Sequence, residues 1–224
     1  MGIPKVGSTR LNQRLNFLKI CALLFTLCAV PHITAAQANS QNPPLPAPGT
    51  YQIDPLHTFV YFSAWHHIVG SVRGRFDKVT GTLTVSQDPA DCAVDVTVDT
   101  STVDTQVAER DADLRSPAFF SVKDFPTATY RGRGLHRVSG DSWRLDGTLT
   151  IRGISVVVPV TFTFKGMFPD TKVPRASFHA TAGTNRGKFD MTRDNKMELG
   201  VPPVPGLDVQ IEIDVEADAA SPAH

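Results

Sequence analysis

Apolar and polar residues alternate along most of residues 50–216. The last run is the clearest, because acidic or amide side chains separate Val209, Ile211, Ile213 and Val215. Successive side chains of a strand point to opposite faces, so a period of two predicts strands with one buried face. The strands of βαβ units are apolar throughout, and these are not. The sequence therefore predicts an all-β protein with an antiparallel sheet.

Turn residues divide this region into eight predicted strands. The apolar face shifts by one position near Asp77 and Lys78, which predicts a β-bulge in a long bent strand. Pro159 has no amide donor and predicts an edge position or a second bulge. The strands are expected near residues 51–54 with 57–66, 71–85, 92–99, 128–138, 143–152, 155–166, 175–184 and 208–216.

Eight strands can close into a barrel, and closure removes the exposed edges of the sheet. Residues 102–115 are the only segment with a helical pattern, and Asp104 or Thr105 can cap it. We therefore expect an extended antiparallel eight-stranded β-barrel with one short helix.

The composition agrees with this fold class and excludes others. The chain of 224 residues contains 16 Gly and 17 Pro, too many for a helical bundle. An apolar fraction of 41% is enough for a hydrophobic core. The 22 basic and 22 acidic residues balance, whereas nucleic-acid-binding domains usually carry a basic surplus. Nucleic acid is therefore not an expected partner.

The first 38 residues differ from the rest, with four basic residues and no acidic one. The basic stretch is followed by an apolar run at residues 20–30, too short to span a bilayer. Small residues at 36 and 38, or at 34 and 36, then match the pattern that a signal peptidase cleaves. We expect residues 1–38 to be a signal peptide cleaved after Ala38 or Ala36, and the protein to be periplasmic or secreted. An uncleaved anchor is the alternative.

Removal of this segment changes the charge and the cysteine count. It leaves 18 basic and 22 acidic residues, a net charge of about −4, and no candidate transmembrane segment. Only Cys92 then remains, which excludes an internal disulfide. Its usual role is that of a small buried apolar residue, and a mixed disulfide or a bridge within a homodimer is the alternative. Residues 39–50 contain four prolines and predict an extended linker, and residues 218–224 a flexible tail.

Motifs for catalysis, metals and nucleotides are weak. His66 and His67 are adjacent on a strand and point to opposite faces, so they do not readily share one metal ion. Neither a G-x-S-x-G elbow nor a Gly-rich phosphate loop is present. We predict no catalytic site, no metal site and no cofactor. The charge run at residues 109–113 fits a solvated helix turn or an acid–base cluster, and Phe119 with Phe120 fits helix packing or the lip of an apolar cavity.

A series of short motifs spans residues 51–217. The motifs are Tyr51-Gln-Ile-Asp54, His57-Thr-Phe-Val-Tyr-Phe62, His66, Gly74-Arg-Phe76, Gly81-Thr-Leu83, Val103-Asp-Thr105, Glu109-Arg-Asp111, Leu114-Arg-Ser116, Phe119-Phe120, Phe125-Pro126, Gly147-Thr-Leu-Thr150, Gly153-Ile-Ser155, Pro159-Val160, Arg186, Phe189, Met191 and Val215-Glu-Ala217. In this order and spacing they resemble the YceI-like family of secreted, lipocalin-like lipid-binding proteins. The chain departs from the family at Asp113, where His is usual, at Asp190, where Gly is usual, and in the Pro-rich residues 200–206.

The resemblance implies a barrel that holds an isoprenoid chain or another long amphiphile, such as a quinone, a polyprenyl phosphate or a fatty-acid amide. An eight-stranded barrel is about wide enough for its own side chains or one slim ligand. Each buried methylene contributes about 0.8 kcal/mol, so a long tail can bind without specific polar contacts. Small inward residues are predicted to leave room for the ligand, or alternatively to let the sheets pack closely: Gly74, Gly81, Gly147, Ala176, Ala180 and Ala182.

We predict a ligand site with an apolar wall and a polar mouth. His66, Arg110 and Asp111 are candidates for a headgroup contact, and Phe119, Phe120 and Met191 for the apolar rim. The candidate wall consists of Phe62, Phe76, Leu83, Leu149, Val160, Phe162, Phe178 and Ile211. The leading hypothesis is an exported lipid carrier without chemistry of its own. The alternatives are an envelope enzyme that uses His66 and residues 110–113 on a lipid, and a module whose acidic surface binds a protein such as a membrane cytochrome.

Overall fold

The computed structural model describes residue 2 and residues 44–66, 70–169, 171–191 and 207–220, and of His66 the backbone only. Contacts divide the chain into Met1–Gln41 and Asn42–His224, and the fold described below is that of the second unit. Apart from Gly2, the predicted signal peptide lies outside the described residues, as do the start of the predicted linker, His67 and residues 200–206. No helix in the described ranges is long and apolar enough to cross a membrane.

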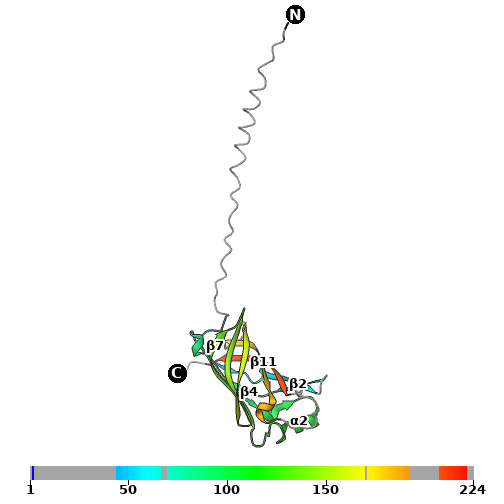
Figure 1. The fold of residues 1–224 in the computed structure, drawn as a ribbon. Coiled ribbons are helices and arrows are strands. Elements are labelled where there is room, and N and C mark those ends of the chain that lie inside the picture. Colours follow the sequence, from blue (N-terminus) through cyan, green and yellow to red (C-terminus); the bar gives the residue numbers. More distant parts are fainter. Residues whose placement is uncertain (1, 3–43, 67–69, 170, 192–206, 221–224) are drawn as a thin grey trace. The chain divides into compact units, whose positions relative to one another are not determined.

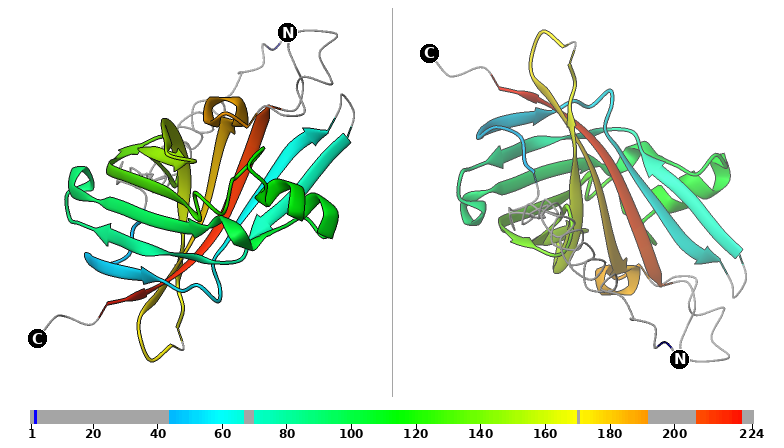
Figure 2. Two further views of the ribbon diagram at one scale, coloured as in Figure 1. Left: turned by 90° about the horizontal axis from the view of Figure 1, so that it is seen from below. Right: turned by 90° about the horizontal axis from the view of Figure 1, so that it is seen from above.

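Eight antiparallel strands form a closed ring. They are β1 (Gly49–Ile53), β4 (Val79–Val85), β5 (Ala93–Asp99), β7 (Thr127–Arg137), β8 (Ser142–Ile151), β9 (Ile154–Met167), β10 (Arg175–Asn185) and β11 (Asp208–Ala219). Each pairs with the next in that order, and β11 pairs back with β1. Figure 1 and Figure 2 show these strands wound into a barrel. Alternate side chains point inward, so that Ala176, Phe178 and Ala180 of β10 are all buried. The predicted eight-stranded barrel is confirmed.

Three further strands extend the sheet beyond the ring. They are β2 (Phe59–His66), β3 (Gly70–Phe76) and β6 (Val103–Asp104). Strand β11 pairs with β2 over residues 209–214 and with β1 over residues 217–219. The fully buried Thr58 bridges this change of partner, because its hydroxyl accepts from the Glu216 N–H (3.1 Å) and donates to the Glu216 carbonyl (3.2 Å). The N-terminal half of β11 therefore pairs with the three-strand extension, and its C-terminal end pairs with β1 and closes the ring.

The long strand predicted over residues 71–85 is divided into two. Strand β3 ends at Phe76 and β4 begins at Val79. The backbone N–H groups of Asp77 and Lys78 both donate to the hydroxyl of Thr102, at 3.2 and 3.3 Å, rather than to a neighbouring strand. The predicted change of phase is therefore present, but it is a break between strands with different partners rather than a bulge in one strand.

The predicted helix is present but shorter. It is α2 (Ala108–Arg115), and the residues before it form the short 3-10 helix η2 (Thr100–Thr102) and β6. The capping prediction is wrong, because the N-cap is Val107 and makes no side-chain capping bond. Thr105 instead donates both its N–H (2.8 Å) and its hydroxyl (2.6 Å) to the buried carboxylate of Asp111. This contact fixes α2 against the segment that precedes it.

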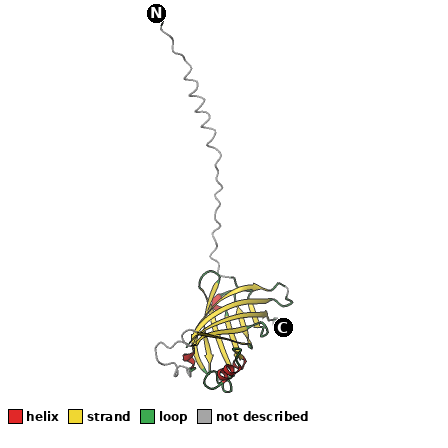
Figure 3. Ribbon diagram, turned by 90° about the vertical axis from the view of Figure 1, so that its right-hand side faces the viewer, coloured by secondary structure: helices red, strands yellow, loops and turns green. Residues whose placement is uncertain are grey.

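The two ends of the barrel are unlike. The strand directions place the β7–β8 turn, the β9–β10 turn and η1 (Pro89–Asp91) at the same end, here called the hairpin end. The other, here called the helix end, carries α2 and η3 (Arg186–Phe189), and Figure 3 shows α2 at one end of the strands. A buried cluster of Phe119, Phe189 and Met191 packs against the inner side chains of β8 and β9 at the helix end. This cluster covers the helix end of the barrel next to β8 and β9.

The described part of the two predicted flexible segments is more ordered than expected. Strand β1 begins at Gly49, inside the predicted linker 39–50. Strand β11 continues through Asp218 and Ala219, inside the predicted tail, and the Ala219 N–H donates to the Pro174 carbonyl (2.8 Å). Ring closure explains both differences, because the β1–β11 pairing uses residues 51–53 and 217–219.

Candidate functional site: an apolar cavity in the barrel

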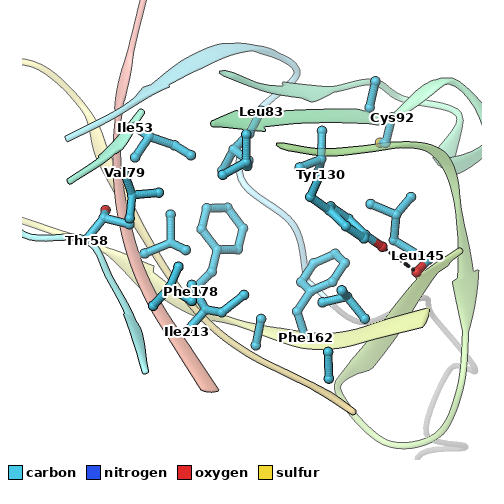
Figure 4. Close-up of a pocket in the computed structure, with 18 of the residues that line it drawn as sticks. Ile53, Thr58, Val79, Leu83, Cys92, Tyr130, Leu145, Phe162, Phe178 and Ile213 are labelled. Atoms are coloured by element: carbon cyan, nitrogen blue, oxygen red, sulfur yellow. Dashed lines mark hydrogen bonds between the residues drawn. The ribbon is translucent and has the colours of Figure 1, made fainter. Parts of the chain in front are cut away.

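The ring encloses an apolar cavity of about 180 Å³. Every strand of the ring contributes to its wall, and Figure 4 shows Leu83, Tyr130, Phe162, Phe178 and Ile213 directed into it. Apolar cavities of roughly 150 Å³ stay free of water and take up apolar molecules. The cavity is therefore suited to hydrocarbon. Its wall also includes Ile53, Thr58, Val60, Val79, Val85, Cys92, Leu135, Leu145, Val158, Ala180, Ala182 and Val215.

The side-chain polar atoms of Tyr130, Cys92 and Thr58 in this wall already have partners. The Tyr130 hydroxyl lies 2.9 Å from the Val158 carbonyl oxygen and 3.2 Å from that of Leu145. Burial raises the pKa of Tyr130 to about 12, so the hydroxyl stays protonated and can donate at neutral pH. The Cys92 sulfur accepts from a backbone N–H at 3.3 Å, and the Thr58 hydroxyl is held by β11. The hydroxyl and thiol groups of these three residues therefore offer no free hydrogen-bond donor to a ligand.

The glycines of the inner face do not provide space for a ligand. A Cβ atom at Gly147 would overlap the ring of Tyr130, one at Gly74 would lie 2.5 Å from the ring of Phe62, and one at Gly81 would overlap the β5 backbone. The prediction that these glycines leave room for a ligand is wrong, because each of them accommodates a side chain or the backbone of a neighbouring strand. Of the alanines in the same prediction, Ala180 and Ala182 line the cavity, whereas Ala176 is buried in the core.

Six of the eight predicted wall residues line the cavity: Leu83, Leu149, Val160, Phe162, Phe178 and Ile211. The other two, Phe62 and Phe76, pack on one another beyond the ring, with centroids 5.6 Å apart. Phe76 also meets Phe120 edge to face at 5.4 Å. The reason is that β2 and β3 leave the ring, so their apolar faces are covered by the segment after α2 rather than by the cavity.

Two predicted rim residues lie in the buried cluster at the helix end. Phe119 is 6% exposed and Met191 is 5% exposed, and both pack with Phe189. Phe120 packs against the same cluster. The three side chains therefore form a core rather than the lip of the cavity.

The described residues do not assemble the predicted polar mouth. The Arg110 guanidinium donates to the hydroxyl (2.8 Å) and the carbonyl (2.9 Å) of Thr105, the residue that also holds Asp111. Both charged side chains therefore stabilise the start of α2. The backbone of His66 ends β2, and its side chain lies outside the described atoms. The acid–base interpretation of residues 109–113 gains no support from this geometry.

Sequence reasoning missed several wall residues, for two reasons. Val96, Ile213 and Val215 belong to the same alternating runs that place the strands, so the pattern could have identified them. Tyr130 gave no comparable signal, because the pairing of β7 with β8 is irregular between Gly132 and Leu135 and the alternation breaks there.

Residues 44–48, here called the strap, also contribute to the cavity although a free linker is predicted. Leu45 lines the cavity and Pro46 is buried. The Tyr51 hydroxyl donates to the Ala47 carbonyl at 2.8 Å. The strap leads directly into β1 at the hairpin end, so it closes part of the cavity on that side.

We expect loss of the strap to accelerate ligand exchange. A chain that begins at Gly49 loses the partly buried Leu45 and the buried Pro46, and full burial of a leucine is worth about 1.5–3 kcal/mol. The dissociation rate of a bound long-chain lipid should therefore rise at least about tenfold. Tyr51→Phe removes only the hydrogen bond, worth about 1 kcal/mol, and should raise the rate about fivefold. Stopped-flow displacement of a fluorescent fatty acid measures both rates, and unchanged rates would contradict a closing role.

Arg175 lies at the centre of an ion-pair cluster on the outer face of the barrel. Its guanidinium is 2.9 Å from a carboxylate oxygen of Asp54, 3.1 Å from one of Glu216 and 2.7 Å from one of Asp218. Among the described residues, Asp54, His57 and Glu216 are close enough to be joint metal ligands. Arg175 already bonds both carboxylates of that group, so we assign the cluster a structural role in joining β1, β10 and β11.

We expect the acid stability of the protein to depend on Asp54. Burial alone would raise the pKa of Asp54, but hydrogen bonds from His57 and a backbone N–H and the charge of Arg175 together lower it. As the pH falls, the unfolded state therefore binds a proton first. The stability that Asp54 contributes is complete above about pH 5 and is lost as the pH falls below about 4.

Urea unfolding at about pH 7 and about pH 3.5 tests this expectation. Asp54→Asn should lower the free energy of unfolding by about 1–3 kcal/mol at neutral pH and reduce the further loss in acid. The control is Asp141→Asn, a substitution of an exposed carboxylate on the β7–β8 turn. An acid loss as large in Asp54→Asn as in the unsubstituted protein would contradict the assignment.

A closed antiparallel ring around an apolar cavity defines the class of small β-barrels whose interior can hold a ligand. The YceI-like domain model matches residues 51–217. Protein YceI of Salmonella newport (strain SL254) is 34% identical over 148 residues, which cover 64% of this chain and 77% of that protein. The chain therefore belongs to the YceI-like family, as its motifs indicate.

Solved structures share the fold at low sequence identity. BcnA of Burkholderia cenocepacia has a TM-score of 0.63 at 18% identity, with 73% of this chain and 98% of that chain covered. A polyisoprenoid binding domain from Saccharophagus degradans has a TM-score of 0.58 at 16% identity, with 76% and 98% covered. These likenesses support the barrel fold.

Proposed function

We propose that this protein binds one long hydrocarbon chain, such as the tail of an isoprenoid lipid, inside the barrel. The observation that carries the proposal is the cavity itself, in which aliphatic and aromatic side chains of all eight ring strands enclose the space. The polar atoms of Tyr130 and Thr58 in that wall are held by the protein's own backbone. Such a cavity favours the apolar part of an amphiphile and leaves its headgroup at one end.

The family membership of this chain and its fold similarity to a known binding domain support an isoprenoid ligand. The chain is a member of the YceI-like family, and a protein that shares its fold is described as a polyisoprenoid binding domain. Each methylene buried from water contributes about 0.8 kcal/mol, which is about a fourfold gain in affinity. Affinity should therefore rise with chain length until the cavity is filled, whichever headgroup the lipid carries. Quinones and fatty-acid derivatives with the same tail length are therefore the alternative ligands expected to bind with the most similar affinity.

A carrier or reservoir role without chemistry fits the arrangement of the predicted polar residues. Arg110 and Asp111 are bonded to Thr105 and hold the fold together, so neither is presented to the cavity wall. The order of basic, apolar and small residues within positions 1–38 is that of a signal peptide. The proposed place of action is therefore the periplasm or the extracellular space.

Extraction of the purified protein with organic solvent, followed by mass spectrometry, tests the proposal. We expect a co-purified long-chain lipid, and one-to-one binding of an added polyprenyl alcohol after the lipid has been removed. A lipid-free extract together with no binding of the added alcohol would contradict it. Release of a chemically altered lipid would support the enzyme alternative, and capture of a protein partner by the lipid-free barrel would support an interaction module.

A further inference from the structure

Trp143 lies on the inner face of β8, at the hairpin end of the barrel. It is 2% exposed. It shares that face with Leu145, two residues along the strand, and its partner on β9 is Phe162. Both neighbours line the cavity, whereas Trp143 is not among the lining residues. The indole therefore lies next to the cavity wall at the hairpin end, the end at which Leu45 of the strap also lines the cavity.

The indole N–H of Trp143 is buried and has no hydrogen-bond partner among the described residues. A buried donor without a partner is destabilising, and proteins rarely retain one without a reason. The Thr184 hydroxyl is also without a partner, on the inner face of β10 near the helix end. A hydroxyl can turn about its C–O bond toward a new acceptor, whereas the indole ring fixes the direction of its N–H. Of these two donors, the indole N–H of Trp143 is therefore the one whose direction is fixed before a ligand binds.

We propose that the Trp143 N–H binds an acceptor oxygen of the ligand's headgroup. The inference rests on the proposed function and adds the orientation of the ligand and the chemistry of its head. The hydrocarbon chain runs from Trp143 through the cavity toward Val79 and Ile211, which line it toward the helix end. The ligand class is a long chain that ends in a hydroxyl, ether, carbonyl or phosphate oxygen, because an indole donates a hydrogen bond and accepts none.

Three probes with one branched chain separate the headgroup from the tail. Phytane is the bare hydrocarbon, phytanol adds a hydroxyl, and phytanyl methyl ether adds an oxygen that can only accept. Displacement of the fluorescent probe N-phenylnaphthylamine gives the three affinities. We expect phytanol and the ether to bind about tenfold more tightly than phytane, the gain from one hydrogen bond at 1.4 kcal/mol per factor of ten.

Trp143→Phe removes the donor and should abolish this tenfold preference while leaving the affinity for phytane within about threefold. The matched control is Trp65→Phe, the same substitution at a side chain that is 56% exposed, and it should keep all three affinities. Equal loss for all three probes in Trp143→Phe would show a packing role alone and overturn the inference. So would equal binding of the three probes to the unsubstituted protein.

A spectroscopic measurement on intact Trp143 does not depend on how well the variant folds. In Trp65→Phe, Trp143 is the single remaining tryptophan, since the chain has two. The ultraviolet resonance Raman band that reports indole N–H hydrogen bonding should shift when the ether is added and stay unchanged with phytane. No shift with the bound ether would overturn the inference. Failure of the proposed function would give a different result, because none of the three probes would then displace the dye.

Discussion

Replacement of Ala182 by phenylalanine is expected to lower the affinity for a long isoprenoid chain at least about a hundredfold. Ala182 lies on β10 and its small side chain lines the cavity beside Ile211 and Val160. A phenyl ring at this position occupies space that the tail needs. If it displaces about four methylenes, the loss is about 3 kcal/mol, or more than a hundredfold in the dissociation constant. Titration with a polyprenyl alcohol measures the change.

The control is Thr181→Phe, the same side chain one residue earlier on the outer, exposed face of β10. Its affinity should stay within about twofold of the unsubstituted protein. The Ala182→Phe protein should still fold, because overpacking typically costs about 1–3 kcal/mol and the cavity next to Ala182 provides space for the ring. Undiminished lipid binding by folded Ala182→Phe would place the ligand outside the barrel and contradict the account.

Gly147→Ala is expected to destabilise the protein by about 2–3 kcal/mol. The added methyl group would overlap the ring of Tyr130, whose hydroxyl reaches the carbonyls of Leu145 and Val158 across this glycine. The ring of Tyr130, which lines the cavity, then has to move, and its buried hydroxyl loses both acceptors. Urea unfolding measures the stability, and the displaced ring should also weaken lipid binding.

A double-mutant cycle separates this contact from a general effect of alanine in a strand. In a Tyr130→Leu background Gly147→Ala should cost less than about 1 kcal/mol, since the overlapping ring is absent. The matched control is Gly183→Ala on the outer face of β10, where an added Cβ meets only the side chain of Gln210 at 3.6 Å. That substitution should be neutral or slightly stabilising. Equal costs at Gly147 in both backgrounds would contradict a Tyr130–Gly147 unit.

The fold was predictable because each ring strand buries one face, and a period of two records that fact directly. Pro159 is an example of a finer feature that also followed from chemistry. Strand β9 pairs with β8 at Pro159, while its pairing with β10 begins only at Val160, so the missing amide costs no bond between β9 and β10. Of the two predictions for Pro159, the edge position therefore fits this pairing, and it followed from the missing amide alone.

The cavity wall was only partly predictable, because alternation shows which face is buried but not what covers it. Phe62 and Phe76 follow the same pattern as Phe178, yet they are covered by one another and by Phe120. The difference arises where β11 exchanges β2 for β1 at Thr58, a contact between residues 158 positions apart in the chain. The glycine predictions failed for a similar reason, since a neighbouring ring fills the space above Gly147.

The structure explains one of the two aspartates that depart from the family pattern. Asp190, where the family usually has glycine, adopts φ 61° and ψ 21° at the end of η3. Aspartate tolerates this left-handed conformation better than most residues, so the turn is kept at a modest cost. Nothing in the structure explains Asp113 in place of the usual histidine.

Photocrosslinking of a bound lipid tests the central claim most directly. The probe is a polyprenyl alcohol with a diazirine in the middle of its chain, and peptide mass spectrometry identifies the residues that it labels. We predict labels on inner residues of β5 and β11, such as Val96 and Ile213, and their loss in Ala182→Phe. Labels on the outer face, for example at the 67% exposed Val157, that persist in Ala182→Phe would contradict binding inside the barrel.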